Sequence, residues 1–290
     1  MYPPNTIMKT ATRTLRIGHQ VYDLGVQPLI MGILNLTPDS FYEGSRLGLG
    51  QMLDIAAQML ADGATILDLG GYSTRPGAAD VSEQAELDRV LPAIEAINQH
   101  LPNAVISIDT FRASVAKVAV RAGAMMVNDV SGGQADPDML GYVAAAKVPY
   151  VLMHSRGTPA TMQSLAQYQD LTYEVVQELR GQLAQLHALG HYEVLIDPGF
   201  GFAKTIDQNY QLLAQLRDLE LLGCPILVGL SRKSMAYRPL GITAPEALNA
   251  TTVLHTLALQ NGAGMLRVHD VKPAAEAIRI WQLYQPYHRG

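Results

Sequence analysis

The segment Leu29–Asn35 (LIMGILN) is a continuous apolar run that ends in a polar residue. The same pattern recurs along the chain: a short apolar run is closed by polar, charged or glycine residues, and a helical periodicity follows. The eight runs cover residues 29–34, 66–69, 105–108, 125–127, 150–152, 194–196, 226–228 and 265–268. Apolar strands that alternate with helices are typical of a parallel sheet buried on both faces. Eight such units predict an α/β fold of the (β/α)8 TIM-barrel type, whose functional groups lie at the carboxyl ends of the strands.

The segments that follow the runs predict helices. These cover residues 51–61, 82–100, 112–122, 138–146, 168–189, 207–222, 245–260 and 273–284. Most of them stop at a glycine, which adopts the left-handed conformation of a chain reversal at little cost. Ser82 is placed to cap the second helix, and Pro92 is expected to kink it.

A β-hairpin is expected before the first apolar run, because residues 14–25 alternate apolar and polar side chains. This hairpin would close the amino end of the barrel. We expect residues 1–13 to form a flexible tail and residues 14–290 to form a single barrel domain. The length suits one barrel of this type.

Composition argues against several classes of protein. Of the 290 residues, 48% are hydrophobic, which is enough for a large core, and the net charge of −5 argues against general nucleic-acid binding. The single cysteine, Cys224, excludes an intrachain disulfide and is expected to be a buried, inert thiol. No apolar stretch is long enough to span a membrane, and residues 1–14 lack the apolar core of a signal peptide. We therefore expect a cytoplasmic protein with no membrane partner.

An anion site is predicted after the last two strands. The seventh run is followed by Ser231-Arg-Lys-Ser234, and the eighth leads into Arg267-Val-His269. Barrels often bind phosphate in these two loops, where arginine contacts phosphate oxygens in pairs and lysine adds a point charge. Arg267 and His269 alternate, so they point to the same side of an extended segment. Surface salt bridges are the alternative explanation.

Three polar residues close other strands, namely Asp109, Asn128 and Asp197. Carboxylates and an amide suit a flat heterocycle with amino and ring N–H donors, although each could instead cap a helix. They lack the accompanying His or Glu residues of a tight transition-metal site. Asn35 closes the first strand and could join phosphate oxygens around Mg²⁺, or be structural. His154 could be a general base or a buried structural histidine.

Two expected loops at the functional end are unusually long. Residues 37–50 include the sequence TPDSF, and residues 72–81 include STRPG. Long loops in this position are commonly lids or binding loops, whereas surface insertions without function are the alternative. Their composition favours a binding role.

Seven motifs, in order, resemble the bacterial dihydropteroate synthases of the pterin-binding family. They lie at residues 31–41 (MGILNLTPDSF), 68–77 (DLGGYSTRPG), 128–132 (NDVSG), 152–158 (LMHSRGT), 197–202 (DPGFGF), 229–234 (GLSRKS) and 267–269 (RVH). Three residues depart from the commonest family pattern: Tyr72, where many members have Glu, Ser155 and Ala160. The resemblance extends over nearly the whole chain.

The resemblance implies a reaction of folate biosynthesis. In this reaction 6-hydroxymethyl-7,8-dihydropterin pyrophosphate condenses with 4-aminobenzoate, giving 7,8-dihydropteroate and pyrophosphate by dissociative substitution. It also implies Mg²⁺ as cofactor, a homodimer formed through outer helices, and a target of sulfonamides.

The family's functional residues carry over to matching positions of this chain. The catalytic residues implied are Asp39, Asp109, Lys233 and Arg267. The implied pterin-binding residues are Asp109, Asn128, Met153, Asp197 and Lys233. Pyrophosphate is assigned to Asn35, which also binds the metal, and to Arg75, Arg267 and His269. The implied 4-aminobenzoate pocket consists of Phe41, Thr74, Arg75, Pro76, Phe202, Lys233 and Ser234.

Two other functions are alternatives to this one. A pterin-dependent methyltransferase would share the barrel and the pterin subsites, but it releases no pyrophosphate and should not need the cationic motifs near residues 231–234 and 267–269. A non-catalytic pterin-binding paralogue should have lost at least one of four residues that the chain retains: Asp39, Arg75, Lys233 and Arg267.

Overall fold

Eight parallel strands form a closed barrel in the computed structural model, which describes residues 13–36, 46–72, 81–158 and 161–287. The strands are β3 (Leu29–Asn35), β4 (Ile66–Gly70), β5 (Val105–Asp109), β6 (Met126–Asp129), β7 (Tyr150–Met153), β8 (Val194–Asp197), β9 (Ile226–Val228) and β10 (Ala263–Val268). The last strand pairs with the first, with Arg267 opposite Met31, which closes the ring. The predicted (β/α)8 barrel is therefore confirmed.

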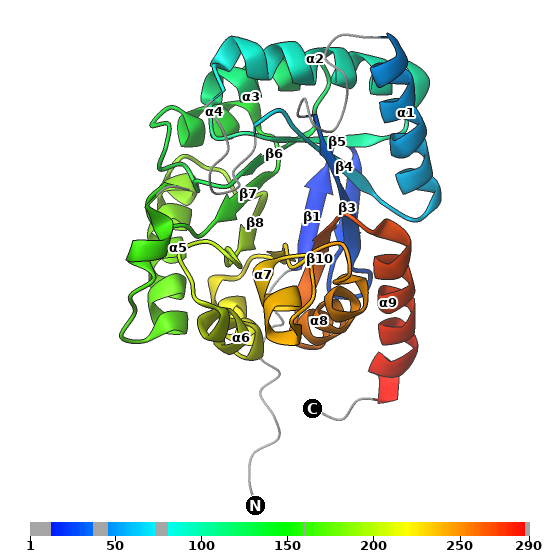
Figure 1. Ribbon diagram of the computed structural model, residues 1–290. Coiled ribbons are helices and arrows are strands. Elements are labelled where there is room, and N and C mark those ends of the chain that lie inside the picture. The colour runs from blue at the N-terminus through cyan, green and yellow to red at the C-terminus, as the bar shows by residue number, and fades with distance from the viewer. Residues whose placement is uncertain (1–12, 37–45, 73–80, 159–160, 288–290) are drawn as a thin grey trace, which may run out of the picture.

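Helices surround the barrel, as Figure 1 shows. They are α1 (Arg46–Ala61), α2 (Glu83–His100), α3 (Ala113–Arg121), α4 (Met139–Ala146), α5 (Leu171–Ala188), α6 (Ile206–Ala214), α7 (Ser234–Tyr237), α8 (Leu248–Gln260) and α9 (Val271–Tyr284). Short 3-10 helices are η1 (Met162–Leu165), η2 (Leu216–Leu222), η3 (Arg238–Leu240) and η4 (Gln285–Tyr287). No helix within the described ranges is both long and apolar enough to cross a membrane.

The helices agree with the prediction except in detail. Ser82 caps α2 by accepting a hydrogen bond from the backbone N–H of Ala85. Pro92 lies inside α2, and the helix continues past it to His100. The helix predicted at 207–222 is divided at Gln215 into α6 and the 3-10 helix η2. The short helix α7 was not expected.

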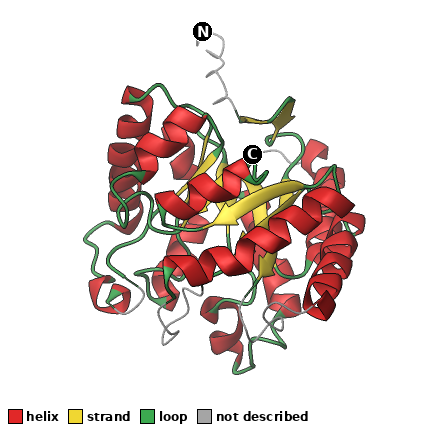
Figure 2. Ribbon diagram, turned by 90° about the horizontal axis from the view of Figure 1, so that it is seen from above, coloured by secondary structure: helices red, strands yellow, loops and turns green. Residues whose placement is uncertain are grey.

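The predicted hairpin is present and covers one end of the barrel (Figure 2). Its strands are β1 (Thr14–Ile17) and β2 (Gln20–Asp23). Leu15, Ile17 and Leu24 are almost fully buried and join an apolar cluster with residues from the interior of the barrel. Arg13, at the expected boundary of the tail, forms an ion pair with Glu220. The tail itself, residues 1–12, lies outside the described residues.

The interior of the barrel changes from apolar to polar along the strand direction. Its apolar layer includes Ile66, Met126, Leu195 and Met265, all almost fully buried. Side chains on one face of a strand recur every second residue. The next interior position along each of these four strands is therefore a polar residue, which is, in chain order, Asp68, Asn128, Asp197 and Arg267. Strand alternation thus gathers these polar groups on the inner side of the barrel, toward its carboxyl end.

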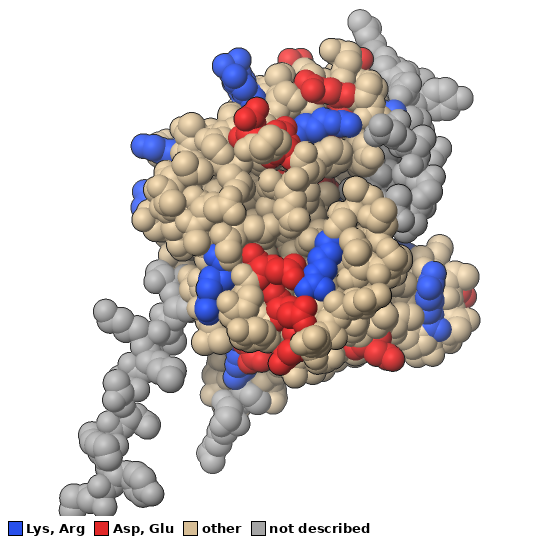
Figure 3. Space-filling model, turned by 90° about the vertical axis from the view of Figure 1, so that its left-hand side faces the viewer, with Lys and Arg blue, Asp and Glu red and all other residues tan. Residues whose placement is uncertain are grey.

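The outer surface carries mixed charge. On the face shown in Figure 3, basic and acidic side chains of the described residues lie close to one another, and most of the coloured surface is uncharged.

Cys224 is buried, as expected. Burial raises the pKa of its thiol to about 11, so the thiol stays protonated at neutral pH.

Candidate active site

Arg267 connects three strands at the carboxyl end of the barrel. Its Nε donates to Oδ2 of Asp68 at 2.6 Å, and its Nη2 donates to Oδ2 of Asp109. The same Oδ2 of Asp68 also accepts a hydrogen bond from Nδ2 of Asn128, at 2.9 Å. Two predicted pterin residues and a predicted pyrophosphate residue thus lie in one network, which Asp68 joins together.

Asp109 is used in this network and not as a helix cap. The following helix, α3, has Arg112 as its N-cap residue. Burial raises the pKa of the Asp109 carboxyl group to about 7, although the guanidinium of Arg267 acts in the opposite direction. Such a group changes its charge near neutral pH, which is common for functional carboxylates.

A second cluster forms around Lys233. Its ammonium group donates to the carbonyl oxygen of Phe200 and lies 5.0 Å from the centroid of the Phe202 ring. Burial lowers the pKa of Lys233 to about 8, and the charge of Asp197 opposes this effect. Oδ1 of Asp197 accepts a hydrogen bond from the backbone of Gly199 at 2.7 Å. The predicted residues Asp197, Phe202 and Lys233 are therefore neighbours.

The residues of the predicted anion site, at 231–234 and 267–269, have different partners. His269 is held by Ser231, whose Oγ lies 3.1 Å from Nδ1 of the imidazole. Arg232, in contrast, has φ = +53° and forms a two-pronged ion pair with Asp270, with both distances 2.8 Å. The guanidinium of Arg232 is thereby engaged by Asp270, as the alternative explanation of salt bridges had it.

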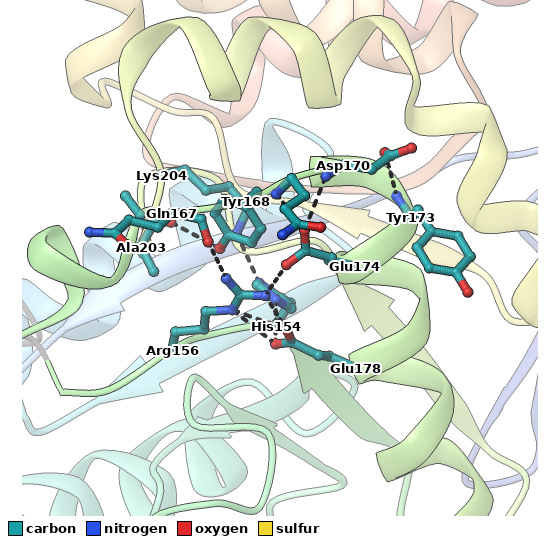
Figure 4. A network of polar contacts seen from close by, with 12 residues as sticks. His154, Arg156, Gln167, Tyr168, Asp170, Tyr173, Glu174, Glu178, Ala203 and Lys204 are labelled. Atoms are coloured by element: carbon teal, nitrogen blue, oxygen red, sulfur yellow. Dashed lines mark hydrogen bonds and ion pairs between the residues drawn. The ribbon is translucent and has the colours of Figure 1, made fainter.

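A buried lysine supports the loop that follows β8, as Figure 4 shows. Nζ of Lys204 contacts Nδ1 of His154 at 2.9 Å and donates to the carbonyl oxygens of Gly199 and Phe202 at 3.1 and 3.0 Å. The carboxylate of Glu178 can only accept, so Nε2 of His154 carries the proton that reaches it at 3.0 Å, and Nδ1 accepts from Lys204.

His154 is therefore a structural residue. It is 1% exposed, and both ring nitrogens are engaged. Burial and the nearby ammonium group of Lys204 lower its pKa to about 4. The possibility of a general base is removed, because neither nitrogen is available to a substrate.

Arg156 ties the neighbouring loop to α5. It donates to Glu174 and Glu178, and its guanidinium lies 4.0 Å from the centroid of the Tyr168 ring (Figure 4). The hydroxyl of Tyr168 in turn donates to the carbonyl oxygen of Ala203 at 3.0 Å. The loops after β7 and β8 are thus joined, and the second of them supplies the groups that hold Lys233.

Comparison with known proteins identifies the family of this chain. The profile of the pterin binding enzyme family matches residues 31–269. A dihydropteroate synthase of Synechocystis is 44% identical over 270 residues, which are 92% of this chain and 93% of that protein. The dihydropteroate synthase of Yersinia pestis, solved with a sulfonamide drug, has a TM-score of 0.87 and 40% identity, covering 94% of this chain and 99% of that one. That of Xanthomonas albilineans, solved with 4-aminobenzoic acid, has a TM-score of 0.85 and 38% identity, covering 94% and 98%.

The chain belongs to the pterin-binding enzyme family. Within this family its similarity is to dihydropteroate synthases over most of both chains. The motifs that carried the resemblance span the barrel from β3 to the end of β10.

Other residues inferred from the pterin-binding family occupy the same end of the barrel. Met153 is 3% exposed and pairs with Asp197 across β7 and β8. Ser234 begins α7, directly after Lys233. Asn35 ends β3, half-buried, with its Cα paired to that of Gly70. Five predicted residues lie outside the described part of the chain: Asp39, Phe41, Thr74, Arg75 and Pro76.

Asp68 and Lys204 were missed in the sequence, although each left a signal. Asp68 is a carboxylate inside an otherwise apolar strand run, ILDLG. It lies two residues after Ile66, which faces the interior of the barrel, so alternation places both side chains on the same face of β4. Lys204 directly follows the DPGFGFA segment, and its burial depends on contacts with His154, 50 residues earlier in the chain.

Proposed function

We propose that this protein catalyses the dihydropteroate synthase reaction. It transfers the pterinylmethyl group of 6-hydroxymethyl-7,8-dihydropterin pyrophosphate to the amine of 4-aminobenzoate, releasing pyrophosphate. The single observation that carries the proposal is the buried network in which Arg267 connects Asp68 and Asp109, with Asn128 bonded to the same carboxylate. The ligands in the related solved structures support 4-aminobenzoate as the second substrate.

The pterin ring is assigned to the polar interior layer. Asp109, Asn128 and Asp197 offer acceptors for the amino and ring N–H groups of a flat heterocycle. Met153 offers a buried apolar surface at the same level of the barrel. Lys233, beside Asp197 and the Phe202 ring, is placed to serve both the pterin and the 4-aminobenzoate sites.

Pyrophosphate departure is the demanding step. The amine of 4-aminobenzoate is already neutral at pH 7 and needs little help from a base. Negative charge grows on the leaving group, and preorganised cations stabilise such charge most effectively in a site that excludes water. Arg267 and His269, alternating at the end of β10, are assigned this role, with Ser231 holding the imidazole.

We propose a dissociative course for the substitution. Loss of pyrophosphate leaves a cationic pterin methylene, and the ionised carboxylate of Asp109 is suited to stabilise it. Trapping a dehydrated pterin together with pyrophosphate before the amine enters would support this course. A concerted displacement would exclude it.

Mg²⁺ is proposed as the cofactor, with Asn35 as its protein ligand. No cluster of three or more His, Cys, Asp or Glu side chains suited to a metal occurs among the residues described. A single amide oxygen fits a cation that keeps most of its waters and shares the oxygens of a phosphate substrate. When bound, the ion would supply further positive charge at the leaving group.

Replacing Asn35 by Ala should weaken the binding of the pterin pyrophosphate substrate only when Mg²⁺ is present. Calorimetric titration at several Mg²⁺ concentrations measures this, and thermal unfolding checks that stability is little changed. Equal Mg²⁺ dependence in the variant and the parent would show that Asn35 is not the ligand.

We also propose a homodimer formed through the last helices. Apolar side chains on α8 and α9 remain exposed, including Val253 (52%), Leu257 (46%), Ile280 (65%) and Leu283 (54%). Burial of such a surface against a second copy is favourable.

The proposed activity is tested by product analysis. Purified protein supplied with pterin pyrophosphate, 4-aminobenzoate and Mg²⁺ should form dihydropteroate and pyrophosphate in equal amounts. No dihydropteroate should form when 4-aminobenzoate is omitted. Absence of both products with folded protein would overturn the proposal.

A further inference from the structure

Asp68 lies at the centre of the site, yet no substrate contact is assigned to it. It is 0% exposed, and the hydrogen-bond donors it meets are Nδ2 of Asn128 and Nε of Arg267. Both donors share one atom, Oδ2, at 2.9 and 2.6 Å. One oxygen therefore connects the residue assigned to the pterin with the residue assigned to the pyrophosphate.

The other carboxylate oxygen of Asp68, Oδ1, differs from Oδ2 in its hydrogen bonding. Oδ1 is buried and has no hydrogen-bond partner within the described ranges. A buried polar atom without a partner costs stability, so this carboxylate does not have the arrangement expected of a group kept for stability alone.

Asp68 also fixes the orientation of the Asn128 amide. A carboxylate beside a guanidinium can only accept hydrogen bonds, so the amide must turn its NH₂ group toward Asp68. Its oxygen, Oδ1, then faces away from the carboxylate, and no residue in the described part of the chain donates to it. Asn128 is thereby made an acceptor toward a ligand, which suits the N–H groups of a pterin.

Asp68 also helps to fix the orientation of the Arg267 guanidinium. Asp68 engages Nε and Asp109 engages Nη2, so the edge of the guanidinium that carries these two nitrogens is fixed. Nη1 donates to none of the described residues, which leaves it for an anionic ligand. The planar group therefore has one orientation, set by two carboxylates on neighbouring strands.

We propose that Asp68 is a positioning residue that sets the hydrogen-bond polarity of Asn128 for the pterin and aims Arg267 at the pyrophosphate. This inference rests on the proposed function and deepens it. It assigns to one buried carboxylate the alignment of two subsites, without contact between Asp68 and either substrate.

The test uses the variant Asp68→Asn and two half-ligands. Calorimetry measures the affinity for 6-hydroxymethyl-7,8-dihydropterin and, separately, for inorganic pyrophosphate with Mg²⁺. An amide at position 68 no longer dictates the orientation of Asn128 and removes a charge beside Arg267. Both affinities should fall about tenfold, the effect of losing one well-formed hydrogen bond, and kcat/KM for the pterin substrate should fall at least as far.

Ser107→Ala is the matched control. Ser107 is fully buried, pairs with Asp68 across β4 and β5, and its Oγ has no partner among the described residues. This variant should bind both half-ligands as the parent does. Equal weakening in both variants would show that any change in this layer disturbs the site, and would overturn a specific role for Asp68.

A swapped pair separates positioning from structure. In the double variant Asp68→Asn/Asn128→Asp, the new amide can donate to the new carboxylate, which again presents an acceptor to the pterin. Affinity for the pterin half should recover more than affinity for pyrophosphate. A folded double variant with no recovery would contradict the proposal, as would parental affinities in Asp68→Asn.

If Asp68→Asn does not fold, the double variant is compared with the parent alone. Recovered affinity for the pterin half then supports the proposal, and lost affinity contradicts it. Failure of the parent to form dihydropteroate would instead overturn the proposed function itself.

Discussion

Asp109 is surrounded by charged groups from several elements. Arg267 on β10 faces it directly, whereas Asp68, Glu86 and Asp129 contribute negative charge from β4, α2 and β6. Burial is the largest influence and raises the pKa of Asp109 to about 7. Because this pKa lies above that of the unfolded chain, the associated stabilisation is present at low pH and is lost as the pH rises through about 7.

Activity should show the opposite dependence on pH. If the ionised form of Asp109 stabilises the cationic methylene, kcat/KM for the pterin substrate should fall as the pH drops below about 7. A pH profile measured with folding monitored in parallel checks this. A profile that stays flat down to about pH 5, well below that pKa, would show that this carboxylate is not required as an anion.

At this scale, the sequence predicted residues at strand ends better than residues within strands. Asp109 and Asn128 could be placed because polar residues after apolar runs are conspicuous, and Arg267 because it forms a cationic motif with His269 at the end of the last run. Asp68 was overlooked inside such a run. The pairing of Arg232 with Asp270 could not be predicted either, because the sequence does not show that the backbone of Arg232 has φ = +53°.

Among the elements, the loop between β8 and α6 is the most constrained near the site. Gly199 has φ = +69°, and a Cβ atom there would lie 2.0 Å from the carbonyl oxygen of His154. The same loop carries the carbonyl groups that Lys204 and Lys233 bind. Its shape therefore depends on a close approach that only glycine permits.

Gly199→Ala should lower the free energy of unfolding by about 3 kcal/mol or more, because a backbone clash adds to an unfavourable φ. Gly190→Ala is the control, since Gly190 has φ = +75° with open space around its Cβ position. It should cost only about 1–2 kcal/mol. Urea unfolding of both variants measures the difference. Equal costs would mean that the contact with His154 imposes no constraint.

Element boundaries were less predictable than element order. The eight strands follow from their apolar runs, but the division of residues 206–222 into α6 and the 3-10 helix η2 does not follow from helical periodicity. The link between the loops after β7 and β8 was also beyond prediction, because it depends on contacts such as that of Lys204 with His154 across 50 residues.

In the whole molecule, the apolar groups that stabilise the fold and the polar groups of the candidate site lie at opposite ends of the barrel. The hairpin seals the amino end with Leu15, Ile17 and Leu24 (Figure 2). The polar network occupies the carboxyl end. This division is usual for barrels of this type, and it predicts that the two ends respond differently to mutation.

Leu15→Ala should cost about 2–5 kcal/mol of stability, because Leu15 is fully buried in the apolar interior. Its kcat/KM should match that of the parent at temperatures where the variant is folded. Val21→Ala, on the same hairpin at a position 59% exposed, should change stability by no more than about 0.5 kcal/mol. A folded Leu15→Ala variant with impaired catalysis would contradict the separation.

The role of Lys233 in both substrate sites is tested by the steady-state rate of dihydropteroate formation by Lys233→Ala. Its kcat/KM should fall on the order of a hundredfold or more, because one buried ammonium group is proposed to serve both substrate sites. Lys117→Ala, at an exposed position on α3, controls for general loss of charge. Parental kinetics in a folded Lys233→Ala protein would show that Lys233 serves neither substrate site.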